Sequence, residues 1–249
     1  MQRDLPLLIL ADIPKDFSLT DLALSEQATK TIELAPSQYQ NLDKLRATVS
    51  GMTFDLICYS APETETILAT KDLQQVFCEP PVEQISGIGI SLSEHITVGR
   101  QDGTVNRALL HLAKHIGQAI KASSIIWQPA QLHIGFDYFA GAIEHYISDG
   151  PFPVLVQIAI SETPEGEMET CGLSYFADQE IRLRAPDNYA ANEVAKRLVR
   201  IAHDMATNGR IEEKSVQDGF IPGEKLSIMP GEDGQWVEIA IISKPLHDL

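Results

Sequence analysis

The stretch from Ser91 to Ile147, SLSEHITVGRQDGTVNRALLHLAKHIGQAIKASSIIWQPAQLHIGFDYFAGAIEHYI, is where the sequence predicts its fold most clearly. Alternating apolar residues predict a strand over residues 87–100, followed by an amphipathic helix from about Val105 to Lys121. A short apolar strand is expected over residues 124–127, and a second helix over about residues 136–147. Two helices that each carry one apolar stripe need a sheet to pack on.

The rest of the chain adds strands and helices in irregular alternation. Leu5–Ala11 is a continuous apolar run, which is typical of a strand covered on both faces. The other expected elements are helices over about 22–32, 36–50, 63–77 and 189–205, strands over 53–60, 154–161, 171–176 and 180–184, and a C-terminal β-hairpin over 225–242. There is no sustained βαβ rhythm. The sequence therefore predicts an α+β fold, with mixed β-sheet layers packed against amphipathic helices and closed by the hairpin.

One internal boundary is indicated by composition. Pro80 and Pro81 interrupt the regular patterns, and tandem prolines stiffen a linker. The predicted division is an N-terminal α/β section over residues 1–80 and a C-terminal α+β section over residues 81–249. A single continuous domain remains the alternative.

Charge and cysteine content limit the classes of function. The chain has 35 acidic and 19 basic residues, a formal charge of −16, which disfavours nucleic acid and anionic membrane surfaces as partners. Cys58, Cys78 and Cys171 are odd in number and lack metal-ligand spacing. The N-terminal apolar run is too short for a signal peptide, and no run approaches the length of a membrane span. A cytoplasmic protein is expected.

His111 and His115 are the clearest candidates for metal ligands. They lie one helical turn apart, a spacing that lets two imidazoles bind one ion. The position after His111 is Leu112, so the glutamate that a zinc protease carries there is missing. The alternative interpretation is a solvated helix flank, which also includes Arg107, and it is the one we favour because two ligands alone do not make a site.

A second candidate site surrounds the end of the 124–127 strand. Small ligands often bind where strands end and helices begin. His95, Trp127 and His133 offer an aromatic face and titratable rings, and we interpret them as ligand-binding candidates. The alternative is a core tryptophan and a hydrogen-bonding loop histidine.

The sequence contains no recognisable catalytic or nucleotide-binding motif. A nucleophile elbow, a P-loop and a complete dinucleotide fingerprint are all missing, because Gly87-Ile88-Gly89 is not followed by the third glycine. No catalytic residue is assigned, and no cofactor is expected.

The order of several motifs resembles the bacterial proteins grouped as domain of unknown function 4261, over roughly Gly51 to Ser243. The residues that carry the resemblance are Ser93-Glu94-His95 with Ile96 and Val98, Ala119, Trp127 and Pro129, Gly172-Leu173, Phe176 and Glu180, Asp218-Gly219, and Glu224-Lys225-Leu226. The resemblance implies a bacterial cytoplasmic α+β protein and no particular activity.

Two functional hypotheses follow. The first is a non-enzymatic binding or regulatory protein that acts through a protein partner or through self-association, with the tail strand Trp236–Ile242 as an edge available for pairing. The alternative is a small-ligand binder or metal-dependent enzyme that uses the region of His95, Trp127 and His133.

Overall fold

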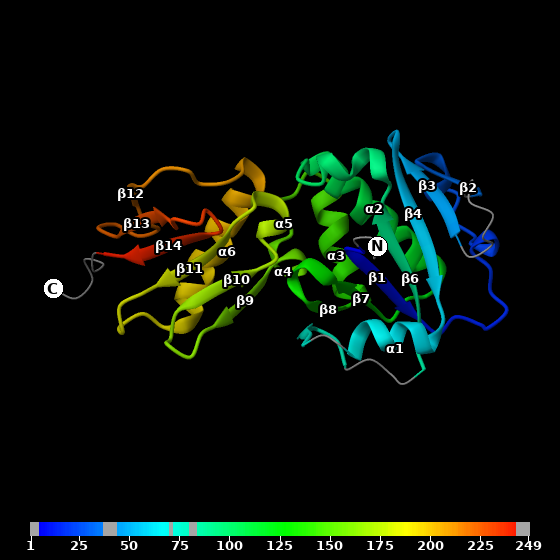
Figure 1. Cartoon of the computed structure of the whole chain (residues 1–249), viewed down its shortest axis with the longest axis horizontal. Coiled ribbons are helices and arrows are strands. Elements are labelled where there is room, and N and C mark those ends of the chain that lie inside the picture. The colour runs from blue at the N-terminus through cyan, green and yellow to red at the C-terminus, as the bar shows by residue number, and fades with distance from the viewer. Residues whose placement is uncertain (1–4, 37–43, 70–71, 80–83, 243–249) are drawn as a thin grey trace. The chain divides into compact units, whose positions relative to one another are not determined.

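The chain folds into two compact units, residues 1–156 (unit 1) and residues 157–249 (unit 2), shown in Figure 1. This computed structural model describes residues 5–36, 44–69, 72–79 and 84–242. Each unit contains one mixed β-sheet with helices packed on it, which confirms the predicted α+β class. No helix in these described ranges is long and apolar enough to cross a membrane.

Unit 1 is organised around an eight-stranded sheet. Its strands are β1 (Leu7–Ala11), β2 (Ile32–Pro36), β3 (Lys44–Val49), β4 (Met52–Tyr59), β5 (Gln74–Val76), β6 (Ser86–Leu92), β7 (Ser124–Trp127) and β8 (Leu132–Gly135). They follow the order β2-β3-β4-β6-β1-β7-β8-β5, and β5 pairs with β8 in parallel while the other pairs are antiparallel. All five residues of β1 are buried between β6 and β7, as the continuous apolar run predicted.

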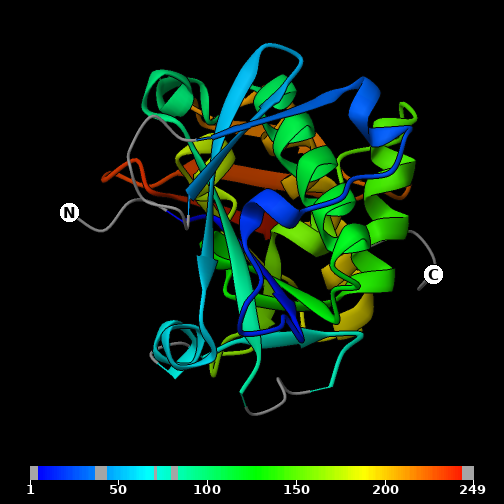
Figure 2. The same ribbon diagram turned by 90° about the vertical axis from the view of Figure 1, so that its right-hand side faces the viewer.

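The two faces of this sheet are covered by different helices (Figure 2). The helices of unit 1 are α1 (Ala61–Ala69), α2 (Gly103–Ala119) and α3 (Phe136–Ile147), and α4 (Val154–Gln157) crosses into unit 2. Ile67 and Leu68 of α1 pack on the cluster Leu8, Leu10 and Ile126. The helices α2 and α3 cover the other face with their apolar stripes. Both were predicted within two residues of their observed ends.

Helix α2 begins where the sequence places its cap. Asp102 accepts a hydrogen bond from the Thr104 backbone N at 2.8 Å, and this satisfies one N–H of the first turn. Gly117, near the other end of α2, lies against α3, and a Cβ there would come within 2.1 Å of the Phe136 ring. The glycine therefore sets the close approach of these two helices.

The N-terminal helices predicted over residues 22–32 and 36–50 are wrong in the described residues. The chain forms the 3-10 turns η1 (Leu19–Asp21) and η2 (Ala28–Lys30), then β2 and β3. Residues 37–43 lie outside the described part. In β3 every second residue is buried, and Ser50 and Gly51 turn the chain back into β4 with positive φ values of 50° and 78°. Such a two-residue turn matches the twist of a hairpin, which overrides a weak helical pattern.

Two further boundaries in unit 1 differ from prediction. The helix expected up to Phe77 ends at Ala69, and residues 74–76 form β5. The strand expected up to Arg100 ends at Leu92 and continues as the 3-10 segment η3 (Glu94–Gly99). At this turn the Ser93 hydroxyl donates to Asp55 Oδ1 at 3.1 Å and its backbone N to the Thr53 carbonyl, so the chain leaves the sheet there.

The division predicted at residues 80–81 stays a prediction. Residues 80–83 lie outside the described part, and the strands before and after them, β5 and β6, belong to the same sheet.

Unit 2 is a six-stranded sheet with its helices on one face (Figure 1). Its elements are β9 (Ala159–Glu162), β10 (Met168–Cys171), α5 (Ser174–Ala177), β11 (Glu180–Arg184), α6 (Ala191–Asn208), β12 (Ser215–Asp218), β13 (Lys225–Pro230) and β14 (Trp236–Ile241). The strand order is β12-β13-β14-β11-β10-β9. The predicted hairpin is confirmed as antiparallel β13 and β14. The predicted strand over 154–161 begins as α4, and the extended segment predicted over 171–176 contains α5.

The tail strand is not an edge. β14 pairs with β13 on one side and in parallel with β11 on the other, so its backbone groups are already used. The prediction that Trp236–Ile242 offers a pairing edge is wrong, because its parallel partner is more than fifty residues away in the sequence and no local pattern announces it.

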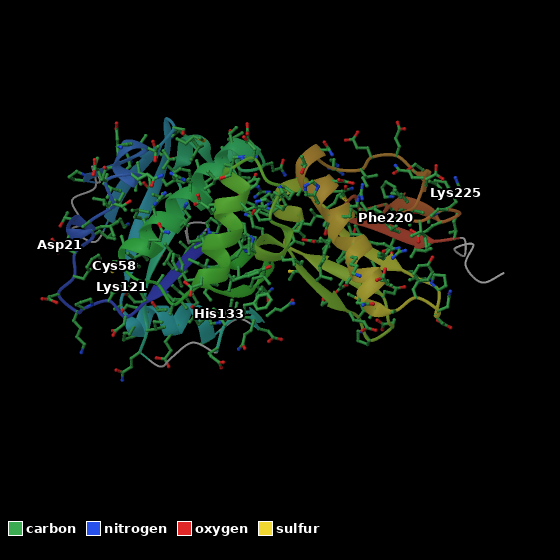
Figure 3. The ribbon with its side chains drawn as sticks, turned by 180° about the vertical axis from the view of Figure 1, so that it is seen from behind. Asp21, Cys58, Lys121, His133, Phe220 and Lys225 are labelled. Atoms are coloured by element: carbon green, nitrogen blue, oxygen red, sulfur yellow. The ribbon has the colours of Figure 1, made fainter. Side chains whose placement is uncertain are left out.

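A buried ion pair joins α6 to the segment before β13. The Glu224 side chain is fully buried and accepts hydrogen bonds from Arg197 Nη2 at 2.7 Å and Nε at 3.1 Å. It also accepts from the Phe220 backbone N at 2.9 Å and the Tyr189 hydroxyl at 3.2 Å. Burial alone would raise the pKa of Glu224, but these donors, Arg197 first, outweigh it and lower the pKa. Phe220 is labelled beside α6 in Figure 3.

Candidate ligand-binding site

Unit 1 contains a cavity of about 390 Å³ at one end of its sheet. It lies where β5 ends, β7 begins, and β8 passes directly into α3. The lining residues are Phe77, Cys78, Glu79, Ala122, Ser123, Ser124, Gly135, Phe136, Asp137 and Tyr138. A cavity of this size at a strand-to-helix junction is typical of sites for small ligands.

A buried polar pair lies at the floor of the cavity, and one of its members lines it. Sheet register places Ser124 opposite Gly135 and Ile126 opposite His133, so Ser124 and His133 share the face of the sheet that α1 covers. His133 is labelled in Figure 3. Its Nε2 lies 2.8 Å from the Ser124 hydroxyl oxygen, and the two residues are 1% and 4% exposed. Only Ser124 lines the cavity.

The other ring nitrogen of His133 has no partner. Within the described residues, Nδ1 is buried and makes no hydrogen bond. Burial lowers the pKa of His133, so the ring is neutral near pH 7 and carries one proton. A buried N–H without an acceptor is rarer than an acceptor without a donor, so we assign the proton to Nε2. His133 then donates to the Ser124 oxygen.

A close backbone contact shapes the same floor. A Cβ on Gly135 would lie 2.1 Å from the Phe77 carbonyl oxygen, so only glycine fits between β8 and α3. Cys78, which follows Phe77 in the sequence, donates its thiol hydrogen to the His133 carbonyl at 3.1 Å. Burial raises the pKa of Cys78, which keeps the thiol protonated and weakly nucleophilic.

The rim combines aromatic rings with carboxylates. Phe77 is 79% exposed and contacts the Tyr138 ring, with ring centroids 4.5 Å apart. Glu79 and Asp137 are exposed lining residues of the same cavity. An exposed aromatic ring gains hydrophobic stabilisation when another molecule covers it, so Phe77 favours contact with a ligand. The rim is the accessible part of the site, and the floor is the enclosed part.

The structure does not gather the three predicted ligand-binding residues. His95 is exposed in η3. Trp127 pairs with Leu132 and therefore faces away from Ser124 and His133, towards the side of α2 and α3, where it is 1% exposed. Of the three, His133 alone reaches the cavity, and it does so through Ser124.

His111 and His115 do lie together on α2. Their ring centroids are 4.5 Å apart, and His111 Nε2 is 3.0 Å from the Thr31 hydroxyl. Lys114, nearly buried between them, pairs with Glu144 of α3. Burial, then His111 and Lys114, lower the pKa of His115 to about 4. Across the described ranges, no group of three His, Cys, Asp or Glu side chains could hold a metal.

Sequence reasoning missed most of the cavity. The sequence predicts Phe77 as the end of a helix and Ser124 as part of a short apolar strand, and it assigns no role to Cys78 in a site. The usable signal was Gly135 directly before a helix that no side chain caps, because helix N-termini often lie beside ligand sites. No family model, curated protein or solved structure matches the chain.

Proposed function

We propose that the protein is a binding protein that holds a small organic cation in the cavity of unit 1. One observation carries the proposal, namely that the exposed Phe77–Tyr138 pair lies on a cavity whose rim also holds the carboxylates Glu79 and Asp137. Aromatic faces attract ammonium groups, and carboxylates neutralise them.

The charge of the whole chain supports the same ligand class. A formal charge of −16 raises the local concentration of small cations around the molecule. A cationic ligand at the rim would cover Phe77, whose ring is otherwise mostly in water. The binding energy would come from apolar contact and charge together.

The chemistry at the floor favours binding over catalysis. The Cys78 thiol is held protonated, and His133 donates to Ser124, so the histidine does not act as a base towards that hydroxyl. These two observations support the hypothesis, drawn from the sequence, of a non-enzymatic binding protein.

Titration with choline, followed by NMR of the backbone amides, tests the proposal. Choline should shift the amides of residues 77–79 and 137–138, and Phe77→Ala should weaken its Kd about three- to fivefold. Val98→Ala is the matched control, because Val98 is 96% exposed and does not line the cavity. Absence of shifts at these amides, or equal weakening by both variants, would overturn the proposal.

A second candidate function is self-association through the open face of the unit 2 sheet. On the face of β11 opposite the buried Ile181 and Leu183, the Arg182 guanidinium is stacked 4.6 Å from the centroid of the Trp236 ring. Glu169 and Glu238 lie 3.4 Å and 3.5 Å from its guanidinium. Alternating charges of this kind are self-complementary, since a second copy turned by two-fold symmetry sets arginine against glutamate.

Light scattering during size-exclusion chromatography tests self-association. Arg182→Glu should abolish a dimer that forms at high concentration, whereas Lys196→Glu on the opposite, helical side should not, because Lys196 is exposed on α6. A monomer at every concentration would refute this candidate. The bacterial family resemblance, which rests on the order of motifs, and the cytoplasmic location, which rests on charge and cysteine content, also stay proposals.

A further inference from the structure

We propose that the ligand of the unit 1 cavity is zwitterionic, and that its carboxylate binds at the floor, where Ser124 is the residue that determines specificity. This inference rests on the proposed cation-binding function and adds a second recognition point. The rim then holds the ammonium group, and the floor holds the carboxylate.

The direction of the Ser124–His133 hydrogen bond supports a donor at the floor. With the proton on His133 Nε2, the Ser124 oxygen accepts at 2.8 Å, and its own hydrogen is left for another acceptor. Ser124 is 4% exposed and lines the cavity, so an acceptor inside the cavity is within its surroundings. A ligand oxygen is an acceptor of this kind.

The neighbouring hydroxyl differs in this respect. Ser123 also lines the cavity, but its hydroxyl donates to the Leu10 carbonyl at 3.2 Å. Ser123 therefore lines the cavity wall, but its hydroxyl hydrogen is already used. Two adjacent serines thus form a matched pair, one that can donate to a ligand and one that cannot.

The end of α3 favours a negative group beside Ser124. Gly135 is the N-cap residue, no side chain caps the helix, and the first-turn residues Phe136, Asp137 and Tyr138 line the cavity. The Phe136 N–H already donates to the Ser123 carbonyl at 3.1 Å, while the first turn of a helix as a whole carries partial positive charge. Hydrogen bonds to a carboxylate are also stronger than those to a neutral oxygen.

The polarity of the cavity separates the two ligand ends. Glu79 and Asp137 are exposed at the rim, where they would repel a carboxylate, whereas Ser124 and Gly135 are buried. A small amino-acid-like molecule can span both parts, because the cavity volume of about 390 Å³ exceeds its size. In this arrangement the carboxylate lies near Ser124 and the ammonium group near the aromatic pair.

A comparison of glycine betaine with choline tests the inference, because both carry a trimethylammonium group and only betaine carries a carboxylate. By calorimetry, wild type should bind betaine about tenfold more tightly than choline. Ser124→Ala should remove that preference, so that betaine and choline bind with similar Kd values. Ser123→Ala should keep the preference.

The two proposals fail in different ways. Equal affinity of wild type for betaine and choline overturns the zwitterion inference and leaves cation binding standing. Binding of neither compound overturns both. If Ser124→Ala does not fold, judged by circular dichroism, the betaine-to-choline ratio of wild type and Ser123→Ala still decides the question. Retention of the full betaine preference in folded Ser124→Ala also overturns the role of Ser124.

Discussion

Each unit contains a buried polar pair, and the two pairs differ in how completely they are hydrogen-bonded. In unit 2, Glu224 receives four donors from Arg197, Phe220 and Tyr189, and Arg197 Nη1 also donates to the Glu193 carbonyl at 2.8 Å. In unit 1, His133 meets Ser124 through one nitrogen and leaves Nδ1 without a partner among the described residues.

The difference separates a structural pair from a candidate functional one. A buried charge is tolerated only when it is paired and hydrogen-bonded, and Glu224 meets both conditions. A neutral histidine with one unsatisfied nitrogen contributes less to stability, and its retention at the floor of a cavity is better explained by what it does for Ser124. Incomplete hydrogen bonding is therefore the more informative observation about function.

The largest expected effect comes from breaking the complete pair. Glu224→Gln keeps the shape but leaves the buried Arg197 charge with only the more distant, half-exposed Glu193 carboxylate at 3.5 Å, and should lower the free energy of unfolding by about 3 kcal/mol. Urea unfolding followed by circular dichroism measures it. Glu193→Gln is the control, because Glu193 is on the surface and contacts Arg197 only at 3.5 Å, and its loss of stability should be much smaller. Similar losses in both variants would contradict the structural role of Glu224.

The incomplete pair should behave differently. Ser124→Ala leaves the His133 N–H buried without an acceptor and should cost about 1–3 kcal/mol. Replacing both partners, as Ser124→Ala with His133→Phe, removes the stranded donor and should recover most of that loss. The same urea experiment provides the cycle. An additive double variant would show that the two side chains do not depend on each other.

A third polar cluster, on α2, allows a test by pH. The folded-state pKa of His115, about 4, is below the unfolded value, so the unfolded state takes up its proton first as the pH falls. Stability from this group is present above about pH 6.5 and declines towards pH 4. From pH 7.5 to 5.0, wild type should lose about 1 kcal/mol more than His115→Gln, allowing for solvent screening. Parallel pH profiles of the two proteins would refute the shift.

The smallest effect is expected at Lys114, whose partner is largely in water. Glu144 is 66% exposed, so Lys114→Met strands no buried charge, and the methionine fills the space of the lysine stem. The loss should stay below about 1 kcal/mol in urea unfolding. Loss of the positive charge should also raise the His115 pKa, measurable by NMR titration. If Lys114→Met lowered the free energy of unfolding as much as Glu224→Gln, the ion pair with an exposed partner would be as important for stability as the buried one, contrary to the prediction.

The sequence by itself determined the parts whose signals are local. The apolar stripe and the Asp102 cap define α2, the apolar run defines β1, and the Gly-rich turn between β13 and β14 defines the hairpin. In each case burial periodicity, caps and turn residues agree with the final packing.

Tertiary structure decided the rest. The segment with weak helical character became β3, because the hairpin turn at Ser50 and Gly51 and pairing with β4 outweigh helix propensity. The parallel pairing of β11 with β14 removed the predicted edge. The register of β7 and β8 then placed His133 with Ser124 and turned Trp127 to the other face. A shift of one residue would reverse those faces, and the sequence of two short strands that are buried at every position has no alternation that fixes their register.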